Sequence, residues 1–433
     1  MRLEMDNLWM PFTSNRDFKA DPRLISHAKG VYLYTPEGRQ IIDASSGLFC
    51  CAAGHSRDEI ATAVYRQLNE LAYSAPFQLG HEHSFELARR LAELTPEGMD
   101  RVFFVNSGSE SIDTAIKIAL AYHYARGEAQ RQRLISRERA YHGVNIGGTA
   151  LSGMVKNRQG FGLTMPGIAH MRHTWLAENR FERNQPQNGA YLADDLQRLV
   201  DNYGADTIAA CFVEPVAGST GCLVPPQGYL ERLREICDNN GILLVFDEVI
   251  CGFGRTGEPF GAQSFGVTPD LMTLAKALTN AALPMGAIVV GRHVYDTIVD
   301  AAPDKAIELF HGYTYSGHPA ACVAGLATLD IYRDENLFEC GRQLSGYFQD
   351  SVFALQEHDV VTDVRGFGMM AGIDVRQDGA PGNAGLTIQK QLFHSGLHVK
   401  ATGDALIVAP PLVSTRAHID EICEKFAGVF KAC

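Results

Sequence analysis

The chain has 433 residues, of which 46% are hydrophobic and 20% are charged, a composition that is ordinary for a globular protein. The length predicts two domains, or one large α/β domain with an appendage. The formal net charge of −12 argues against general binding to nucleic acid, and no apolar stretch approaches the roughly 20 residues that a membrane helix needs.

The cysteines and the N-terminal stretch bear on the compartment. Ten cysteines are scattered along the chain, with Cys50 and Cys51 adjacent and no C-x-x-C pair, which is typical of reduced thiols rather than a disulfide framework. The stretch from Met1 to Thr13 contains two acidic residues and lacks an apolar core, so we expect no secretory signal. We therefore predict a soluble, cytoplasmic protein.

The first predicted element is a hairpin, Val31–Tyr34 and Arg39–Asp43, around a Pro/Gly turn. From about residue 57, helix-like and strand-like segments alternate, which predicts a mostly parallel sheet with crossover helices. The expected strands include 102–105, 208–213, 241–246 and 287–290, with a helix over 229–239. A basic cluster is predicted to form a solvated helix end and loop: Arg126, Arg131, Arg133, Arg137 and Arg139.

After about residue 320 the pattern changes to helices with a short mixed element over 364–375. We interpret this tail, together with the N-terminal segment, as a second and smaller domain. The predicted division is therefore a large domain over 57–318 and a small domain made of 1–56 and 319–433.

Asp247 and Lys276 form the most informative pair in the sequence. Asp247 ends the apolar run Ile242–Phe246, which predicts a strand buried on both faces, and open α/β sheets bind ligands where such strands end. Lys276 has apolar neighbours, and a desolvated lysine is a nucleophile that can form Schiff bases. The pair suits pyridoxal phosphate, which needs a lysine for its aldehyde and an acid for its ring nitrogen. The alternative is a strand-end aspartate and a lysine that reaches solvent.

A second signal follows the strand at 102–105. Ser107, Gly108 and Ser109 form a turn that leads into a helix with apolar residues at i, i+3, i+4 and i+7. The N–H groups and positive dipole end of such a helix, together with the serine hydroxyls, suit a phosphate, although an ordinary N-cap is the alternative. Tyr141 and His142 give a weaker signal, because an aromatic ring there could stack on a flat cofactor or simply cover the core.

Several other motifs do not support a site. Gly252–Gly257 fits G-x-G-x-x-G, but five residues separate it from its strand and 258–261 is poor helix material, so we predict a tight loop beneath the site. Gly80-His81-Glu82-His83 lacks the spacing that places two imidazoles on one helix face, so no metal is expected. No G-x-S-x-G elbow supports serine hydrolase chemistry.

The stretch Asp247–Gly257, followed by Pro269-Asp270 and Ala275-Lys276, resembles the signature of class III pyridoxal phosphate-dependent aminotransferases. Four further stretches match that family in order and approximate spacing: 106–110, 141–143, 214–216 and 312–319. The resemblance covers nearly the whole chain. It implies an α/β protein of transferase fold type I, with a mostly parallel sheet in the large domain and a smaller α+β domain from both chain ends.

The resemblance also assigns roles to residues. Lys276 would form the Schiff base and then move the proton, and Asp247 would pair with the ring nitrogen. The expected cofactor-binding residues are Ser107, Gly108, Ser109, Tyr141, His142, Glu214, Asp247, Val249, Lys276 and Thr314. Thr314 resembles a threonine that reaches the phosphate of the neighbouring subunit, which implies a homodimer with shared active sites and leaves a tetramer open.

Within the family, the chain is most similar to ω-amino acid–pyruvate (β-alanine–pyruvate) aminotransferases, through 9–13, 214–221 and 409–416. It departs from that branch at Phe49, where tryptophan is usual, and at Cys251, where threonine is usual. Arg416 resembles the arginine that binds the substrate carboxylate. Phe12, Phe49 and Phe77 are expected to wall the substrate pocket, with core packing as the equal alternative.

The resemblance thus implies amino transfer from an ω-amino acid or amine to pyruvate. The near alternatives are a 4-aminobutyrate or acetylornithine type of enzyme that uses 2-oxoglutarate, for which we identify no second arginine, and a decarboxylating relative. A nucleotide-dependent oxidoreductase would rest on the glycine loop alone. An inactive, aminotransferase-like regulator is disfavoured because Lys276 is present and the N-terminal segment is too short for a helix-turn-helix.

Overall fold

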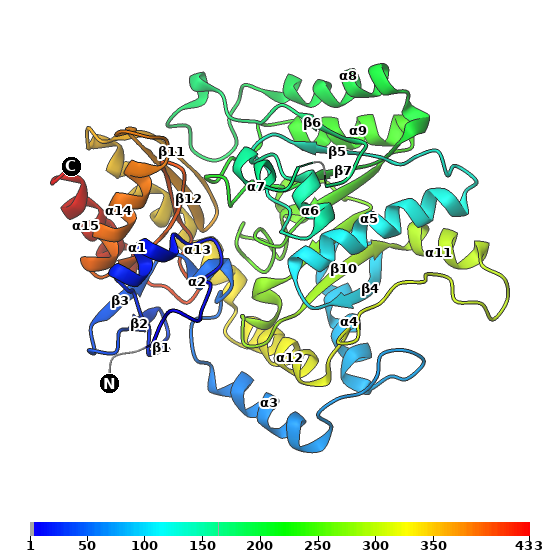
Figure 1. Ribbon diagram of the computed structural model, residues 1–433, viewed down its shortest axis with the longest axis horizontal. Coiled ribbons are helices and arrows are strands. Elements are labelled where there is room, and N and C mark those ends of the chain that lie inside the picture. The colour runs from blue at the N-terminus through cyan, green and yellow to red at the C-terminus, as the bar shows by residue number, and fades with distance from the viewer. Residues whose placement is uncertain (1–3, 163) are drawn as a thin grey trace.

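The apolar runs predicted as strands form a seven-stranded sheet in the computed structural model, which describes residues 4–162 and 164–433 (Figure 1). The strand order is β4-β10-β9-β8-β7-β5-β6. Six strands run in the same direction, and β10 runs in the opposite direction. The strands are β4 (Met99–Val105), β5 (Arg133–Arg137), β6 (Ile168–Met171), β7 (Ile208–Val213), β8 (Leu243–Asp247), β9 (Leu271–Leu274) and β10 (Gly286–Gly291). The prediction of a mostly parallel sheet is therefore confirmed.

Helices cover both faces of this sheet, which explains why its central strands β7, β8 and β10 are apolar on nearly every residue. Successive side chains of β8 point to opposite faces: Leu243 and Val245 pack with α5 (Gly108–Ala125), and Leu244 and Phe246 belong to the core that includes α9 (Tyr229–Asn240). Other helices around the sheet are α4 (Glu82–Leu94), α6 (Ile146–Leu151), α7 (Val155–Gln159), α8 (Asp194–Tyr203) and α11 (Arg292–Ala301).

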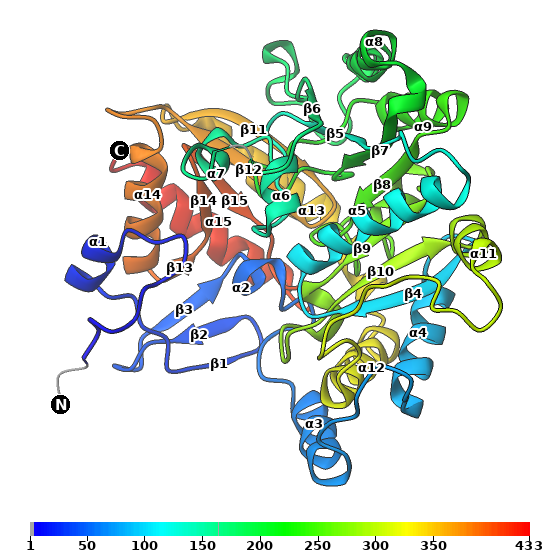
Figure 2. The same ribbon diagram turned by 45° about the vertical axis from the view of Figure 1, so that its right-hand side comes forward.

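Two four-stranded sheets lie beside the large one and draw on both ends of the chain (Figure 2). One has the order β1-β2-β3-β13 and the other β11-β12-β15-β14. Their strands are β1 (His27–Lys29), β2 (Tyr32–Tyr34), β3 (Gln40–Asp43), β11 (Val361–Phe367), β12 (Met370–Val375), β13 (Leu397–His398), β14 (Lys400–Thr402) and β15 (Ala405–Val408). The predicted hairpin is confirmed as the antiparallel pair β2–β3, and β13 from the C-terminal part pairs in parallel with β3.

The helices of this smaller part are α1 (Asn15–Ala20), α13 (Leu337–Phe353), α14 (Asn383–His394) and α15 (Arg416–Phe430). The pairing of β3 with β13 supports a small domain built from both chain ends. However, α12 (Pro319–Asp334) packs on α3 (Asp58–Glu70) and α4, on the side of the large sheet. The boundaries at 57 and 319 stay predictions.

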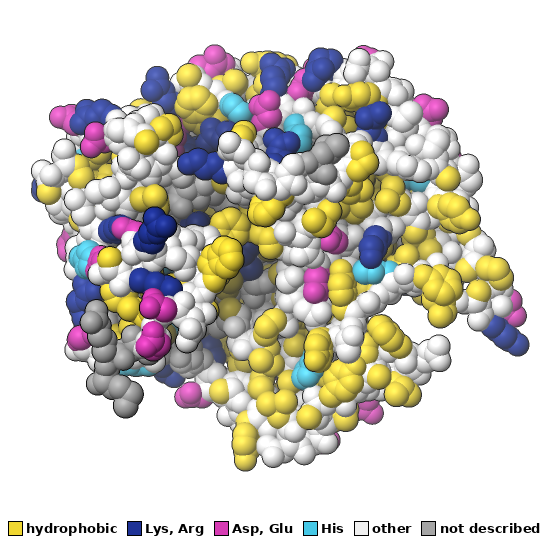
Figure 3. Space-filling view, viewed as in Figure 1, with side chains coloured by type: hydrophobic (Ala, Val, Ile, Leu, Met, Phe, Trp, Pro, Cys, Tyr) yellow, Lys and Arg dark blue, Asp and Glu magenta, His cyan; other side chains and the backbone are white. Residues whose placement is uncertain are grey.

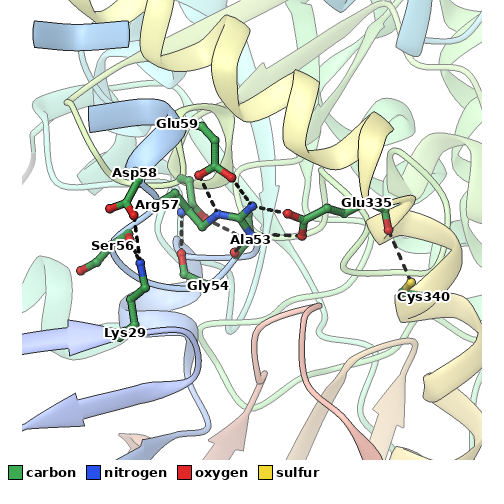
Figure 4. Close-up of polar contacts among 10 residues, drawn as sticks. Lys29, Ala53, Gly54, Ser56, Arg57, Asp58, Glu59, Glu335 and Cys340 are labelled. Atoms are coloured by element: carbon green, nitrogen blue, oxygen red, sulfur yellow. Dashed lines mark hydrogen bonds and ion pairs between the residues drawn. The ribbon is translucent and has the colours of Figure 1, made fainter. Parts of the chain in front are cut away.

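A cluster of charges marks the point where the N-terminal segment enters α3 (Figure 4). The Arg57 guanidinium contacts Glu335, which directly follows α12, and Glu59 of α3 at 3.0 Å. It also donates to the carbonyl of Ala53 at 3.2 Å. Because such half-exposed ion pairs contribute little stability each, this cluster defines a junction rather than a core.

The prediction of a solvated helix end and loop for the basic cluster holds for Arg126, the exposed residue that follows α5, but was wrong for Arg133 and Arg137. Arg133 and Arg137 belong to β5, an interior strand between β7 and β6, and Arg137 is only 1% exposed. The guanidinium of Arg133 lies 4.1 Å from the centre of the Tyr203 ring, and Arg137 donates to the carbonyl of Glu214 at 3.0 Å. The aromatic ring and the carbonyl thus satisfy these guanidinium groups inside a sheet. The spacing of charges along the sequence does not reveal such partners.

None of the helices in the described ranges is both long enough and apolar enough to cross a membrane. All ten cysteines are free thiols, as their spacing predicted. The first three residues of the N-terminal stretch that we assessed for a secretory signal lie outside the described residues.

Candidate active site

A cavity opens at the carboxyl ends of the parallel strands β7 and β8, and of their neighbour β9. Its lining comprises Gly108, Ser109, Tyr141, His142, Gly143, Glu214, Asp247, Val249, Ile250, Ala275 and Lys276. These residues come from five separate stretches of sequence: the start of α5, the loop between β5 and α6, and the segments that directly follow or end β7, β8 and β9. This is the edge at which α/β sheets bind ligands, and it gathers most of the predicted cofactor-binding residues.

Asp247 is the last residue of β8, and its carboxylate is held on both oxygens although the residue is only 6% exposed. Oδ2 lies 2.8 Å from Nδ1 of His142, and Oδ1 accepts from the Thr273 hydroxyl and the Val249 amide, each at 3.2 Å. Sequence reasoning missed Thr273. Its signal was a lone hydroxyl in the apolar strand β9, in register with Asp247.

His142 is 1% exposed and carries the second half of this contact. While Nδ1 meets Asp247, the buried Nε2 has no hydrogen-bond partner within the described chain. A histidine in this position fixes the orientation of the aspartate, because the ring cannot turn without breaking a buried hydrogen bond.

Lys276 follows β9 and begins the short 3-10 helix η4 (Lys276–Thr279). Its backbone has φ of 50°, in the left-handed region that costs energy for a residue with a side chain and is frequent at functional sites. Its neighbours Leu274, Ala277 and Leu278 are buried, as the sequence indicated. Within residues 4–162 and 164–433, no carboxylate lies at ion-pair distance from its amine, which leaves the nitrogen available for chemistry.

The predicted phosphate turn lies where α5 begins. The hydroxyl of Ser107 caps the helix by accepting from the Glu110 amide at 3.2 Å, and Ser109 Oγ accepts from the Val144 amide at 3.0 Å. A Cβ on Gly143, whose φ is 92°, would lie only 2.6 Å from Ser109 Oγ, so only glycine fits there. The N-terminus of this 18-residue helix therefore faces the cavity without obstruction.

Glu214, at the end of β7, is 3% exposed and accepts from the Tyr141 amide at 2.9 Å. Burial raises the pKa of Glu214 to about 7, with a smaller contribution in the same direction from the Asp247 charge and an opposing one from His142. Glu214 therefore positions the backbone of Tyr141 and changes its charge near neutral pH.

Not all predicted site residues meet in this cavity. Arg416 begins α15 and is exposed, with its guanidinium 4.9 Å from the centre of the Tyr347 ring. Phe12 is 76% exposed and lines a different hollow, against α14. Phe49 is 2% exposed and packs in the core. Their roles in binding substrate stay predictions.

Phe77 and Thr314 lie together, away from the cavity that holds Lys276. The Phe77 ring packs against Gly312, and the hydroxyl of Tyr73 donates to the Thr314 carbonyl at 2.9 Å. Both Phe77 and Thr314 are exposed. Within one chain, neither reaches the residues that they are predicted to assist.

Cys251, where the related aminotransferases usually have threonine, lies next to the glycine loop. Cys251 is fully buried, and its thiol donates to the Val216 carbonyl at 3.3 Å, a bond that a threonine hydroxyl could also form. Gly252–Gly257 forms consecutive turns, and the next helix, α10 (Gly261–Phe265), begins only after it. The prediction of a tight loop is confirmed, and nothing in this loop resembles a dinucleotide site.

The donor set of the cavity fits pyridoxal phosphate. A free helix N-terminus with serine hydroxyls suits the phosphate, a buried carboxylate suits a protonated ring nitrogen, and an amine without an ionic partner suits the aldehyde. Tyr141 and Val249 line the space between these groups. Fold and site together therefore define a pyridoxal phosphate-dependent enzyme of the α/β type.

The chain belongs to the class III aminotransferase family, whose model matches residues 13–430. It is 52% identical to an omega-aminotransferase of Caulobacter vibrioides over 98% of this chain and 97% of the relative. An omega-amino acid–pyruvate aminotransferase of Pseudomonas putida is 46% identical over 99% and 96%. A solved omega transaminase of Pseudomonas jessenii, in complex with PMP, has a TM-score of 0.93 at 33% identity, with 98% and 96% of the two chains covered. The protein is thus a pyridoxal phosphate-dependent aminotransferase.

The raised pKa of Glu214 predicts how stability depends on pH. The pKa is about 7 in the folded apoenzyme against 4.5 for the free side chain, so the cost of burying the charge is absent below pH 4.5 and grows until the pH exceeds 7. At full ionisation it amounts to about 3 kcal/mol. Glu214→Gln removes this cost, so the variant should gain thermal stability relative to the wild-type apoenzyme as pH rises from 5.5 to 8.5. The exposed Glu231→Gln is the control, and a difference that stays constant with pH would refute the assignment.

Proposed function

We propose that the enzyme transfers the amino group of an ω-amino acid or primary amine, such as β-alanine, to pyruvate, releasing an aldehyde or semialdehyde and alanine. The observation that carries this proposal is the cavity in which Lys276 and the buried Asp247 face the same space. The names of the relatives at 46–52% identity support the choice of substrates.

The cofactor supplies, when bound, an electron sink that stabilises negative charge on the substrate carbon. Asp247 would keep a proton on the ring nitrogen, and His142 and Thr273 would keep Asp247 in place. The Lys276 amine would hold the cofactor through its aldehyde, and it would serve as the base that removes a proton from the substrate carbon and as the acid that returns it. Tyr141 and Val249 would hold the ring between them.

The number of cationic side chains in the cavity bears on which keto acid accepts the amino group. Among the described residues that line it, Lys276 is the only lysine or arginine. A keto acid with one carboxylate can be bound by a single mobile arginine, for which we propose Arg416 because it is exposed and carries no ion pair within the described chain. A second carboxylate, as in 2-oxoglutarate, would need a further cation, so pyruvate is favoured.

We further propose that two copies of the chain form a homodimer with shared active sites. Figure 3 shows hydrophobic side chains gathered over α4, α12 and the loop after α11. Phe85 of α4 and Phe310 and Tyr315 of the loop after α11 are exposed, as is Phe77 in the loop before α4. A patch of this kind indicates an interface, and it contains the loop of Thr314. A second copy on this patch would explain why Phe77 and Thr314 lie away from their own cavity.

The cytoplasm is the compartment that we propose for the enzyme. Ten free thiols, five of them buried, favour a reducing environment.

Removal of the Lys276 amine should stop turnover, while pyridoxal phosphate should still bind. In Lys276→Ala, the phosphate turn and Asp247 remain, so the protein should still bind pyridoxal phosphate, although without the visible absorbance of the lysine-bound form. Activity should fall by about 10⁴-fold or more. Equilibrium dialysis and steady-state assays measure the two quantities, with exposed Lys156→Ala as control. Normal turnover would eliminate Lys276 as the covalent attachment site.

Acceptor choice is tested by single turnover of the aminated enzyme. After treatment with β-alanine and removal of the excess, the enzyme should recover its visible absorbance at least about tenfold faster with pyruvate than with 2-oxoglutarate at equal concentration, because the cavity lacks a second cation. Stopped-flow absorbance follows the recovery. Faster recovery with 2-oxoglutarate would reject the proposed acceptor.

Shared active sites predict complementation between two inactive variants. Thr314→Asp should weaken phosphate binding in the neighbouring subunit by repulsion, and Lys276→Ala inactivates its own site. A mixed dimer keeps one site that has both Lys276 and the partner's Thr314, so mixing should restore up to about half of the activity per mixed dimer. No recovery on subunit exchange, confirmed by mass spectrometry of the dimers, would argue that each subunit's site is complete.

A further inference from the structure

The tight loop at Gly252–Gly257 has a role that catalysis by Lys276 and Asp247 does not explain. Arg255, at its centre, is 2% exposed, and it has no carboxylate partner within the described chain. Its guanidinium instead donates to three neutral oxygens: Nη1 to the Met369 and Pro410 carbonyls at 3.0 and 2.6 Å, and Nη2 to the Ser46 hydroxyl at 3.0 Å. Burial lowers the pKa of Arg255 to about 10.

A buried cation without a counter-ion is costly, so stability alone gives little reason for it. Its three partners, however, come from segments far apart in sequence: the N-terminal part, the turn between β11 and β12, and the stretch before α15. The planar guanidinium can hold all three at fixed angles, which a single ammonium cannot. Arg255 therefore joins the loop that follows Asp247 to the two chain ends.

The N-terminal partner belongs to a strained turn, residues 45–50. Ser46, Gly47 and Phe49 have φ of 47°, 67° and 63°, and such a run persists only where its surroundings hold it. Asp43 provides one anchor, because its carboxylate accepts from the amides of Ser45 at 2.9 Å and Gly47 at 2.5 Å. Arg255 provides the other through the Ser46 hydroxyl, which itself donates to the Ala409 carbonyl at 2.7 Å.

The 45–50 turn lies close to Lys276. Directly after it, the Ala53 amide donates to the Asn280 side chain at 2.9 Å, and Asn280 donates back to the Gly54 carbonyl at 2.8 Å. Asn280 immediately follows η4, the 3-10 helix that Lys276 begins. The segment that follows the turn is thus joined by hydrogen bonds to the end of the helix that Lys276 begins.

The loop around Arg255 has little freedom to move. A Cβ on Gly254 would lie 2.6 Å from the Phe338 ring and 2.7 Å from Leu412, and one on Gly368 would lie 2.6 Å from the Arg255 carbonyl. The loop is therefore wedged between α13, the C-terminal stretch and the β11–β12 turn, so a displacement of Arg255 would be passed to its partners.

We propose that Arg255 is a positioning residue for substrate: it fixes the 45–50 turn and the 409–416 stretch relative to Asp247 and Lys276, and so sets the shape of the substrate entrance. The proposal rests on the proposed function, because the two segments carry Phe49 and Arg416. Arg255 itself contacts neither substrate nor cofactor. Its removal should change how substrates bind and are distinguished, and leave cofactor loading intact.

The test compares Arg255→Met with Arg57→Met, which removes another arginine that joins the N-terminal segment to the rest. In the Arg255 variant, the KM values for β-alanine and pyruvate should rise about tenfold while kcat changes less than about threefold. The ratio of kcat/KM for benzylamine over β-alanine should shift by about fivefold or more. Ser46→Ala should act in the same direction but less. Arg57→Met should leave the KM values and the selectivity ratio unchanged.

Hydrogen exchange on the holoenzyme gives a readout that needs no substrate. Amides in 45–51 and 409–413 should exchange about tenfold faster in Arg255→Met, and those of β8 should not. If Arg255→Met does not fold, the same KM, selectivity and exchange measurements are made on Arg255→Lys and Ser46→Ala. Unchanged KM values and selectivity, or wild-type exchange in the turn, would overturn the proposal. A wild-type enzyme inactive with β-alanine and pyruvate would instead refute the proposed function, while the exchange comparison would still judge the role of Arg255.

Discussion

The hydrogen bonds to the Asp247 carboxylate are the interaction on which the rest of the site depends. A carboxylate that is 6% exposed is costly to bury unless its oxygens accept hydrogen bonds, and it can pair with a ring nitrogen only if its orientation is fixed. His142 and Thr273 supply these bonds from a loop and from the adjacent strand. The acid thus lies at the carboxyl end of the central strand β8, and Lys276 lies just beyond the end of the neighbouring strand β9.

Both the large sheet and the segments from the two chain ends help to position the residues around Asp247. Helices on both faces of the large sheet bury its strands and leave their carboxyl ends as the place where α5, the Asp247 loop and Lys276 converge. Segments from both chain ends lie beside this centre, and Arg255 connects them to the Asp247 loop. The centre would then determine the reaction, and the attached segments would determine which amine is accepted.

Local patterns predicted much of this, and long-range contacts did not. The bounds of β7 and the position of Asp247 at a strand end followed from apolar runs, and the start of α5 followed from its periodicity. Strand β5 was missed because Arg133 and Arg137 are satisfied by partners that lie far away in the sequence. Thr273 needed the strand register, and Arg255 needed the positions of Met369 and Pro410. For Phe77 and Thr314, the missing information is a second copy of the chain.

The central claim is that Asp247 holds a proton on the ring nitrogen of the cofactor. It is tested most directly by the ¹⁵N NMR shift of ring-labelled pyridoxal phosphate bound to the enzyme at about pH 8, well above the range in which a free carboxylic acid keeps its proton. We expect the shift of a protonated pyridine nitrogen in the wild type and that of an unprotonated nitrogen in Asp247→Asn. An unprotonated nitrogen in the wild type would contradict the account.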